Sequence, residues 1–268
     1  DMLNNVSQAN IEQERNLYAC FYLTVGDALT EVLTPLNCKT RGLESLADLI
    51  NPQKMFPSSF ITLTVPEYSV SANSAKIYDF IYICNKDKDS NECSMNGWNA
   101  INRNYELALK CFPIMINEYK LKGLCVGRIG CDLSQFGDNI TITDFLPYNE
   151  LQEKMRESKF LFLPNIYDAS PRVVGESLTK GLPVLMNQNI ICGFKYITKE
   201  TGEYFIDEHN IRNALDNLIY KLSNNLYTTR KWWEKNYGIE KTSKKLRNFL
   251  YLQYPEILEN ITQVSFNI

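Results

Sequence analysis

The chain has 268 residues, of which 44% are hydrophobic and 22% are charged, and its formal net charge is -3 at pH 7. This composition excludes intrinsic disorder, collagen-like repeats and small disulfide scaffolds, and the length suits one large domain or two unequal ones. The slightly acidic balance provides no long-range attraction toward nucleic acid or anionic lipid, so we expect a globular protein that binds no nucleic acid.

The first 75 residues carry little recognisable chemistry. Apolar residues recur at intervals of three and four over residues 16–33 and 43–50, which predicts two helices. A β-branched run at 60–65 predicts a short strand, and the turn-rich stretch 66–74 has the composition of a linker. We therefore place a domain boundary at residue 75.

From residue 76 onward, apolar runs alternate with amphipathic segments. The predicted strands are 77–84, 123–126, 140–143, 160–163 and 183–186. The predicted helices are 102–121, 149–158, 171–180 and 210–222. Strands that are apolar on both faces and alternate with helices form parallel sheets with helices on both sides. The predicted fold class is therefore α/β, a Rossmann-type doubly wound parallel sheet.

Cysteine and histidine usage argues against a metal site. The eight cysteines contain no C-x-x-C pair, and His209, for which a surface position is expected, is the single histidine. Cys84 and Cys125 lie within predicted strands, where cysteine acts as a small hydrophobe. We expect reduced and mostly buried thiols, and no bound metal. The cysteines are Cys20, Cys38, Cys84, Cys93, Cys111, Cys125, Cys131 and Cys192.

The sequence contains no membrane or export signal. No apolar stretch approaches the roughly 18 residues that a membrane-spanning helix needs, and the amino terminus lacks the pattern of a signal peptide. We therefore expect a cytoplasmic protein. The sequence begins with Asp1 rather than Met, so it could be an excised portion of a longer chain.

The most informative stretch follows the predicted strand 160–163. Ser170 suits a helix N-cap and Pro171 the first helical position, so backbone N–H groups and the positive end of the helix should face a cleft at the carboxyl ends of the strands. That arrangement suits a phosphate. Asp168 and Glu176 flank the helix start, and ionised carboxylates are strong acceptors for paired sugar or ribose hydroxyls. Sugar nucleotides carry both groups.

This stretch resembles the E-x7-E signature of glycosyltransferase family 4 and related retaining enzymes. Asp168 stands at the first acidic position, Glu176 at the second, and residues 181–184 (GLPV) match the run that follows them. The resemblance covers about residues 77–250. Its other matching segments are 144–151, 193–197 and 201–203.

The resemblance implies a GT-B architecture, in which two Rossmann-like domains face each other and the carboxy-terminal one holds the donor nucleotide. Residues 1–75 are then a reduced or truncated N-terminal acceptor-side domain with its linker, and residues 76–222 are the donor domain. Residues 223–268 form C-terminal helices that pack back on the N-terminal part through aromatic anchors such as those in Lys231–Trp233. A membrane-surface contact of this basic segment is the weaker alternative.

The resemblance also implies roles for individual residues. Glu176 binds the donor ribose, and Asp168, one methylene shorter than the usual glutamate, binds the hydroxyls of the transferred sugar. The donor is a nucleotide-diphospho-sugar of UDP or GDP, and transfer proceeds with retention and without a metal. Because the leaving phosphate accepts the proton of the acceptor, no histidine base is needed. Further implied donor contacts are Leu146, Ser170, Pro171, Arg172 and Val173.

A departing diphosphate needs a positive charge beside it. The family supplies an arginine and a lysine after the first strand, but Asn96 stands where the lysine is expected. Lys86 and Arg103 are equally good candidates to replace that lysine beside the diphosphate.

The segment 127–130 (GRIG) follows a predicted strand and could let the backbone approach a nucleotide. A lone G-x-x-G is more often a tight turn. Arg128 either contacts the donor or acceptor or is a solvated loop arginine, and we favour the solvated loop. Gly127 and Arg128 are kept as donor-binding candidates.

Two other functions are weighed against transfer. Asn96, Asp168 and the short acceptor half depart from the family pattern, which favours a non-catalytic nucleotide-sugar-binding or scaffold domain as the alternative. A sugar-nucleotide epimerase is disfavoured because its acid and base groups are not recognisable. The acceptor is an unknown glycan, protein or lipid. The Asn-, Ile- and Lys-rich style is similar to glycosyltransferase-like proteins of large DNA viruses.

Overall fold

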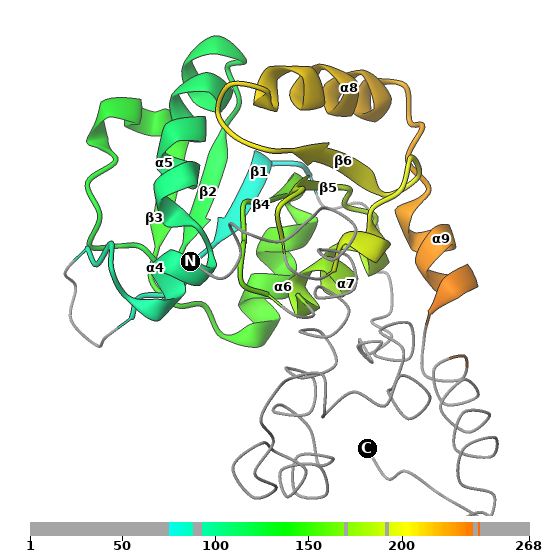
Figure 1. Cartoon of the computed structure of the whole chain (residues 1–268), viewed down its shortest axis with the longest axis horizontal. Coiled ribbons are helices and arrows are strands. Elements are labelled where there is room, and N and C mark those ends of the chain that lie inside the picture. The colour runs from blue at the N-terminus through cyan, green and yellow to red at the C-terminus, as the bar shows by residue number, and fades with distance from the viewer. Residues whose placement is uncertain (1–74, 88–92, 169–170, 191–192, 238–240, 242–268) are drawn as a thin grey trace, which may run out of the picture. The chain divides into compact units, whose positions relative to one another are not determined.

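The computed structural model of the chain describes residues 75–87, 93–168, 171–190, 193–237 and 241 (Figure 1). The chain divides into two units, and Val65–Lys235 is the unit that holds nearly all of these residues. The two helices predicted before residue 51, the strand at 60–65 and the linker at 66–74 lie outside the described residues. The fold given below is that of Val65–Lys235.

The described residues form a six-stranded sheet in which all neighbouring strands are parallel. The order along the sheet is β3-β2-β1-β4-β5-β6. The predicted doubly wound α/β fold is confirmed. The strands are β1 (Tyr78–Ile83), β2 (Gly123–Val126), β3 (Ile140–Thr143), β4 (Ser158–Leu163), β5 (Val184–Asn187) and β6 (Gly202–Phe205).

The sequence did not reveal β6. Gly202 and Phe205 at its ends are buried, whereas Glu203 and Tyr204 between them are partly exposed. Among the described strands, β6 is the last of the sheet and pairs with β5 alone. An edge strand is less enclosed than a central one, so β6 lacks the continuous apolar run by which the inner strands are recognised.

Helices cover both faces of the sheet, with α5 and α8 on one face and α6 and α7 on the other (Figure 1). The ends of α6, α7 and α8 agree with the predicted helices to within two residues. The α-helices are α4 (Trp98–Asn102), α5 (Tyr105–Phe112), α6 (Tyr148–Arg156), α7 (Arg172–Thr179), α8 (Ile211–Ser223) and α9 (Thr229–Asn236). The π-helix η5 (Pro113–Glu118) and the 3-10 helices η6 (Ser134–Asn139) and η7 (Phe194–Tyr196) complete the set.

The single helix predicted at 102–121 is divided into α5 and η5, and α4, which ends where that helix was expected to begin, was not predicted. Asn104 adopts a left-handed conformation with φ 49° between α4 and α5. Pro113 then ends α5, because proline has no backbone N–H to donate to the preceding turn, and the chain winds on as a π-helix. Arg103, which was expected at the start of a long helix, therefore caps the carboxyl end of α4.

Successive side chains of a strand point to opposite faces of the sheet, and in β1 both faces are buried. Phe80 and Tyr82 pack with α5 and α8, while Ile81 between them faces the other layer. Between the sheet and the helices α5 and α8, the centroids of neighbouring aromatic rings lie 5.4 to 6.3 Å apart. Each such pair stabilises the fold by about 0.5–1.5 kcal/mol beyond the effect of its burial. The clustered rings belong to Phe80, Tyr82, Phe112, Phe136, Phe160, Phe162 and Phe205.

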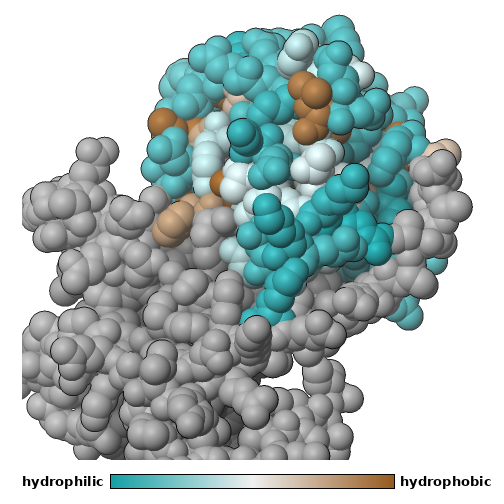
Figure 2. Space-filling model, turned by 90° about the vertical axis from the view of Figure 1, so that its right-hand side faces the viewer, coloured by the Kyte–Doolittle hydropathy of each residue, from teal (hydrophilic) through white to brown (hydrophobic). Residues whose placement is uncertain are grey.

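The basic and aromatic segment begins with α9. Trp233 is 3% exposed, and its ring lies 5.7 Å from the ring of Tyr196 in η7. This tryptophan is therefore an internal anchor of the described unit. The described part of the face in Figure 2 is predominantly hydrophilic, and its apolar residues form small separate patches.

The turn after β2 depends on Gly127. The Cys131 N–H donates to the Arg128 carbonyl at 2.9 Å, so the tight-turn interpretation of 127–130 is confirmed. Gly127 has φ +93°, and a Cβ on it would lie 2.6 Å from both Asn85 Cα and the Cys84 carbonyl oxygen. Only glycine allows this close approach of the loops that follow β1 and β2.

We expect Gly127→Ala to destabilise the protein by more than the roughly 1–2 kcal/mol of the backbone conformation alone, because Cβ would also meet main-chain atoms that cannot move aside. Gly181→Ala is the matched control, since Gly181 has φ +85° and open space around it. Urea unfolding of both variants measures the difference. Equal destabilisation would contradict the proposed steric role of the turn.

Candidate functional site

The candidate site lies at the carboxyl ends of β1 and β4. These strands are neighbours, but the chain continues from β1 toward β2 on one side and from β4 toward β5 on the other. In open parallel sheets, ligands bind at this kind of switch point, because the two loops diverge there. The loop after β1 leads into α4, and the loop after β4 carries Asp168 into α7.

Arg103 and Asn165 both contact Asp168. Its Oδ2 forms an ion pair with Arg103 Nη1 and accepts a hydrogen bond from Asn165 Nδ2 at 3.1 Å. The side chains of Arg103 and Asp168 are 31% and 14% exposed. Two residues expected at the donor site, Arg103 and Asp168, are thus in direct contact at the switch point.

The loop that carries Asp168 is attached on both sides. The Ile166 N–H donates to the Asn102 carbonyl at the end of α4, at 3.1 Å. Asn187 Nδ2, at the end of β5, donates to the Pro164 carbonyl at 3.1 Å. These two hydrogen bonds tie the loop to the neighbouring elements, so Asp168 has a defined position.

Glu176 lies one to two turns into α7 and faces α6. Its Oε2 accepts a hydrogen bond from Gln152 Nε2 at 3.2 Å, and Gln152 is 1% exposed. Lys180 Nζ donates to the Glu176 carbonyl at 3.1 Å. The two expected carboxylates therefore have separate partners: Asp168 is bound from α4, and Glu176 is bound from α6.

Lys86 points away from the switch point. Its Nζ lies 3.1 Å from Oδ2 of Asp144, which follows β3, and β3 is at the far end of the sheet from β4. The N–H of Phe145 and, next, the Lys86 ammonium lower the pKa of Asp144. The sequence did not decide between Lys86 and Arg103 as the cation of the donor site. In the structure, Arg103 is the one of these two that contacts Asp168.

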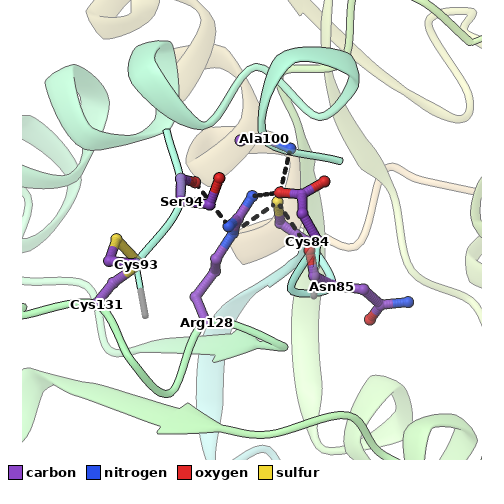
Figure 3. Close-up of a disulfide and its surroundings, with 8 residues drawn as sticks. Cys84, Asn85, Cys93, Ser94, Ala100, Arg128 and Cys131 are labelled. Carbon is purple, nitrogen blue, oxygen red and sulfur yellow. Dashed lines mark hydrogen bonds and ion pairs between the residues drawn. A yellow bond between two sulfur atoms is a disulfide. The ribbon is translucent and has the colours of Figure 1, made fainter. Parts of the chain in front are cut away.

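Arg128 is a buried structural residue with 2% exposure, so the expected solvated loop arginine is wrong (Figure 3). Its Nε donates to Cys84 Sγ and its Nη1 to the Ser94 carbonyl, both at 3.0 Å. Nη2 lies 3.5 Å from Asp87 Oδ2, and the guanidinium stacks over the Tyr105 ring at 4.7 Å. The guanidinium faces the interior, so Arg128 is not part of the proposed donor site.

Asp87 joins Arg128 to α4. Its carboxylate accepts hydrogen bonds from the N–H groups of Asn99 and, at 3.4 Å, Ala100 in the first turn of that helix. The Asp87 and Arg128 side chains are 8% and 1% exposed, so removal of either leaves a buried charge uncompensated, which costs about 3–5 kcal/mol. This pair holds the amino end of the helix whose carboxyl end carries Arg103.

Cys93 and Cys131 form a disulfide, so the expectation of reduced thiols is wrong for this pair (Figure 3). The cysteines are 38 residues apart, but they follow β1 and β2, which are adjacent in the sheet. Cys84, Cys111 and Cys125 are buried free thiols, as expected, and burial raises the pKa of Cys111 to about 12. The cysteines outside the described residues are Cys20, Cys38 and Cys192.

The other expected contacts lie around the starts of α6 and α7. Pro171 is buried and precedes α7 instead of opening it, so the expected first helical position belongs to Arg172. Arg172 is exposed, whereas Val173, and Leu146 before α6, are half-buried. Ser170 lies outside the described residues. The side chain of His209 is 85% exposed, so the expected surface histidine is confirmed.

Three solved structures share this fold at low sequence identity. TarM has a TM-score of 0.52 at 16% identity over 71% of this chain and 38% of TarM. A TarM mutant of S. aureus, solved with Fondaparinux, alpha-GlcNAc-glycerol and UDP, has a TM-score of 0.51 at 14% identity over 80% of this chain and 40% of its own. The described unit has a GT-B-like fold.

Sucrose-phosphate synthase from Thermosynechococcus elongatus is also similar to this GT-B-like unit, with a TM-score of 0.50 at 16% identity over 69% of this chain and 47% of the synthase. This chain therefore spans less than half the length of each of these three structures. At such identities the similarity concerns the fold. No family model and no curated protein matches the sequence.

Two buried amides belong to the site but were not predicted. Asn165 contacts Asp168, and Gln152 contacts Glu176; each amide is 1% exposed. Gln152 lies three residues before the buried Met155 of α6, where helical periodicity predicts an apolar residue. A polar residue at a core position was therefore the signal for Gln152. Asn165 lies in a loop, where the sequence offers no such contrast.

Within the described residues, no group of three or more His, Cys, Asp or Glu side chains is arranged to hold a metal ion. Within the same residues, no helix has the length and apolar character needed to cross a membrane.

We expect the Cys93–Cys131 disulfide to stabilise the protein by about 3–4 kcal/mol, because it closes a 38-residue separation in the unfolded chain. Cys93→Ser with Cys131→Ser should lower the unfolding free energy by that amount. Urea unfolding, with and without dithiothreitol, measures it. Cys111→Ser is the control for loss of a thiol alone. A reductant effect that persists in the double variant would contradict the assignment.

The Lys180 amine should make stability depend on pH. Burial lowers its pKa from 10.5 to about 8, so between these values the unfolded chain binds more protons than the folded one. The contribution of Lys180 to the unfolding free energy should then rise with pH over that window, by at most about 1.4 kcal/mol per pH unit, reduced by solvent screening. Lys180→Met should remove this contribution, so the difference in unfolding free energy between wild type and Lys180→Met should change with pH in urea unfolding from pH 7 to 10. Lys122→Met, an exposed site, should retain the Lys180 contribution.

Proposed function

We propose that the chain binds a nucleotide-diphospho-sugar and transfers its sugar, with retention, to a glycan, protein or lipid acceptor. The observation that carries this proposal is the placement of Asp168 and Glu176 on one loop and helix after β4, beside the switch point of a GT-B-like sheet. The TarM structure solved with UDP and alpha-GlcNAc-glycerol is consistent with a UDP-sugar donor.

The proposed roles follow from the chemistry of each group. Glu176 accepts hydrogen bonds from the ribose hydroxyls, since a carboxylate has two oxygens for two neighbouring donors. Asp168 accepts hydrogen bonds from hydroxyls of the transferred sugar. Arg103 neutralises the diphosphate, because its guanidinium is half-buried at the switch point and stays charged at any working pH.

Retention is proposed to proceed through front-face attack. In that mechanism the bond between the sugar and the diphosphate breaks as the acceptor oxygen approaches from the same side, and the leaving phosphate takes the acceptor proton. The protein then needs a cation for the leaving group more than a general base. The single histidine of the chain, His209, is exposed and follows β6, which is remote along the sheet order from β1.

A non-catalytic nucleotide-sugar-binding domain is the second candidate. Arg103 Nη1 and Asp168 Oδ2 are paired with each other, so these two atoms can meet a donor only after the ion pair opens. Asn96 also stands in place of the lysine of the family pattern, which leaves one fewer cation for the leaving group. Donor binding without any transfer or hydrolysis would favour this candidate.

Donor binding is tested by thermal shift of the whole chain against UDP-, GDP- and TDP-sugars and the free nucleoside diphosphates. A ligand at 100 times its dissociation constant stabilises the native state by about 2.7 kcal/mol. We expect one nucleotide to stabilise the protein selectively. Glu176→Gln should weaken its binding about 10- to 100-fold, because a charged acceptor becomes neutral.

Glu106→Gln is the matched control, because Glu106 lies on exposed α5 surface on the other side of the sheet. It should leave binding unchanged. Stabilisation by none of the ligands, or equal binding by wild type and Glu176→Gln, would refute the proposed donor site.

A further inference from the structure

We propose that Gln152 and Asn165 are positioning residues, each of which holds one donor-binding carboxylate in the orientation that meets the donor. Gln152 acts on Glu176, and Asn165 acts on Asp168. This inference rests on the proposed function, because it assigns a role to two amides within the same site.

Gln152 reaches Glu176 from a fully enclosed position. It lies on the inner side of α6 with 1% exposure, and its Nε2 is 3.2 Å from Glu176 Oε2 and 4.0 Å from Met155 Sδ. A glutamate side chain has three rotatable bonds, so a lone carboxylate on α7 would sample many orientations. The hydrogen bond from Gln152 binds one carboxylate oxygen and thereby restricts them.

Asn165 has the same relation to Asp168 within one loop. It is 1% exposed, and its Nδ2 donates to Asp168 Oδ2 at 3.1 Å. Arg103 Nη1 contacts the same oxygen. Two donors from different elements, the β4–α7 loop and the end of α4, therefore converge on one oxygen of Asp168.

Asn165 becomes the important donor when a nucleotide sugar binds. Arg103 is long and 31% exposed, and in the proposed function it turns to the diphosphate. Asn165 is short and buried, and it comes from the loop that Ile166 and Asn187 hold in place. Asp168 thus keeps a hydrogen bond that fixes its orientation after its ion pair is lost.

A purely structural role does not account for these amides. Gln152 Oε1 and Asn165 Oδ1 are buried, and within the described part of the protein they have no hydrogen-bond partner. A buried carbonyl oxygen without a donor destabilises the folded state, so an apolar side chain of the same shape would serve packing better. Each amide thus lowers the stability of the folded state, but its N–H group donates a hydrogen bond to one of the two carboxylates.

The test compares the full-length wild-type chain with Gln152→Met and Asn165→Leu by calorimetric titration with UDP, UDP-glucose, GDP and GDP-mannose. Gln152→Met should weaken the nucleoside diphosphate and its sugar conjugate alike, about 3- to 10-fold, because Glu176 is assigned to the ribose. Asn165→Leu should weaken only the sugar conjugate, because Asp168 is assigned to the sugar. The melting temperature should be equal or higher in both variants.

Double-mutant cycles test whether each amide acts through its carboxylate. Gln152→Met should have no further effect on binding in a Glu176→Gln background, and Asn165→Leu none in an Asp168→Asn background. Gln135→Met is the matched control, because it replaces the same amide by the same side chain at an exposed position in η6. It should change neither binding nor melting temperature.

Three results would overturn the inference while leaving the proposed function intact. The first is that the effects of the two substitutions on binding affinity add in the double-mutant cycles. The second is that Asn165→Leu weakens the free nucleoside diphosphates and the nucleotide sugars equally, and the third is that Gln152→Met leaves binding unchanged although Glu176→Gln weakens it. Failure of both Gln152→Met and Gln152→Ala to fold would mark that amide as structural and also overturn its assigned role. If the wild-type chain binds none of the four ligands, the proposed function fails and the inference fails with it.

Discussion

The strand order β3-β2-β1-β4-β5-β6 is the constraint on which the candidate site depends. Because neighbouring strands are parallel, the chain must cross back over one face of the sheet before the next strand can begin, and these crossovers place helices on both faces. These crossovers run in opposite directions from β1 and β4, so the loops at their carboxyl ends diverge. Arg103 and Asp168 meet at that point, although 65 residues separate them.

Buried polar groups then hold the diverging loops. Asp87 and Arg128 secure the amino end of α4, and the Ile166 N–H secures the β4–α7 loop to its carboxyl end. Gln152 and Asn165 belong to the same kind of network. Within the described residues their carbonyl oxygens are buried without a hydrogen-bond partner, as are Asn102 Oδ1 and Arg128 Nη2. Buried polar groups are normally hydrogen-bonded, and the site departs from that rule at these atoms.

Local patterns predicted much of the fold. β2 and β3 have the predicted ends: β2 is an apolar run that is buried throughout, and β3 is a short β-branched run with Ile140 buried at its start. The break at Asn104 and Pro113 was missed, because apolar periodicity continues through it. β6 was missed because Glu203 and Tyr204 at its centre interrupt any apolar run between the buried Gly202 and Phe205.

The sequence by itself determined the α/β class, the helices on either side of β4, and Asp168 and Glu176 as the acidic pair beside a helix start. Only the tertiary structure decided that Arg103 and not Lys86 contacts Asp168, that Arg128 is buried, and that Cys93 pairs with Cys131. The physical reason is the distance along the chain over which local sequence patterns carry information. Periodicity and capping report on neighbours within a few turns of the chain, whereas the partner of a charge or a thiol depends on which loops the strand order brings together.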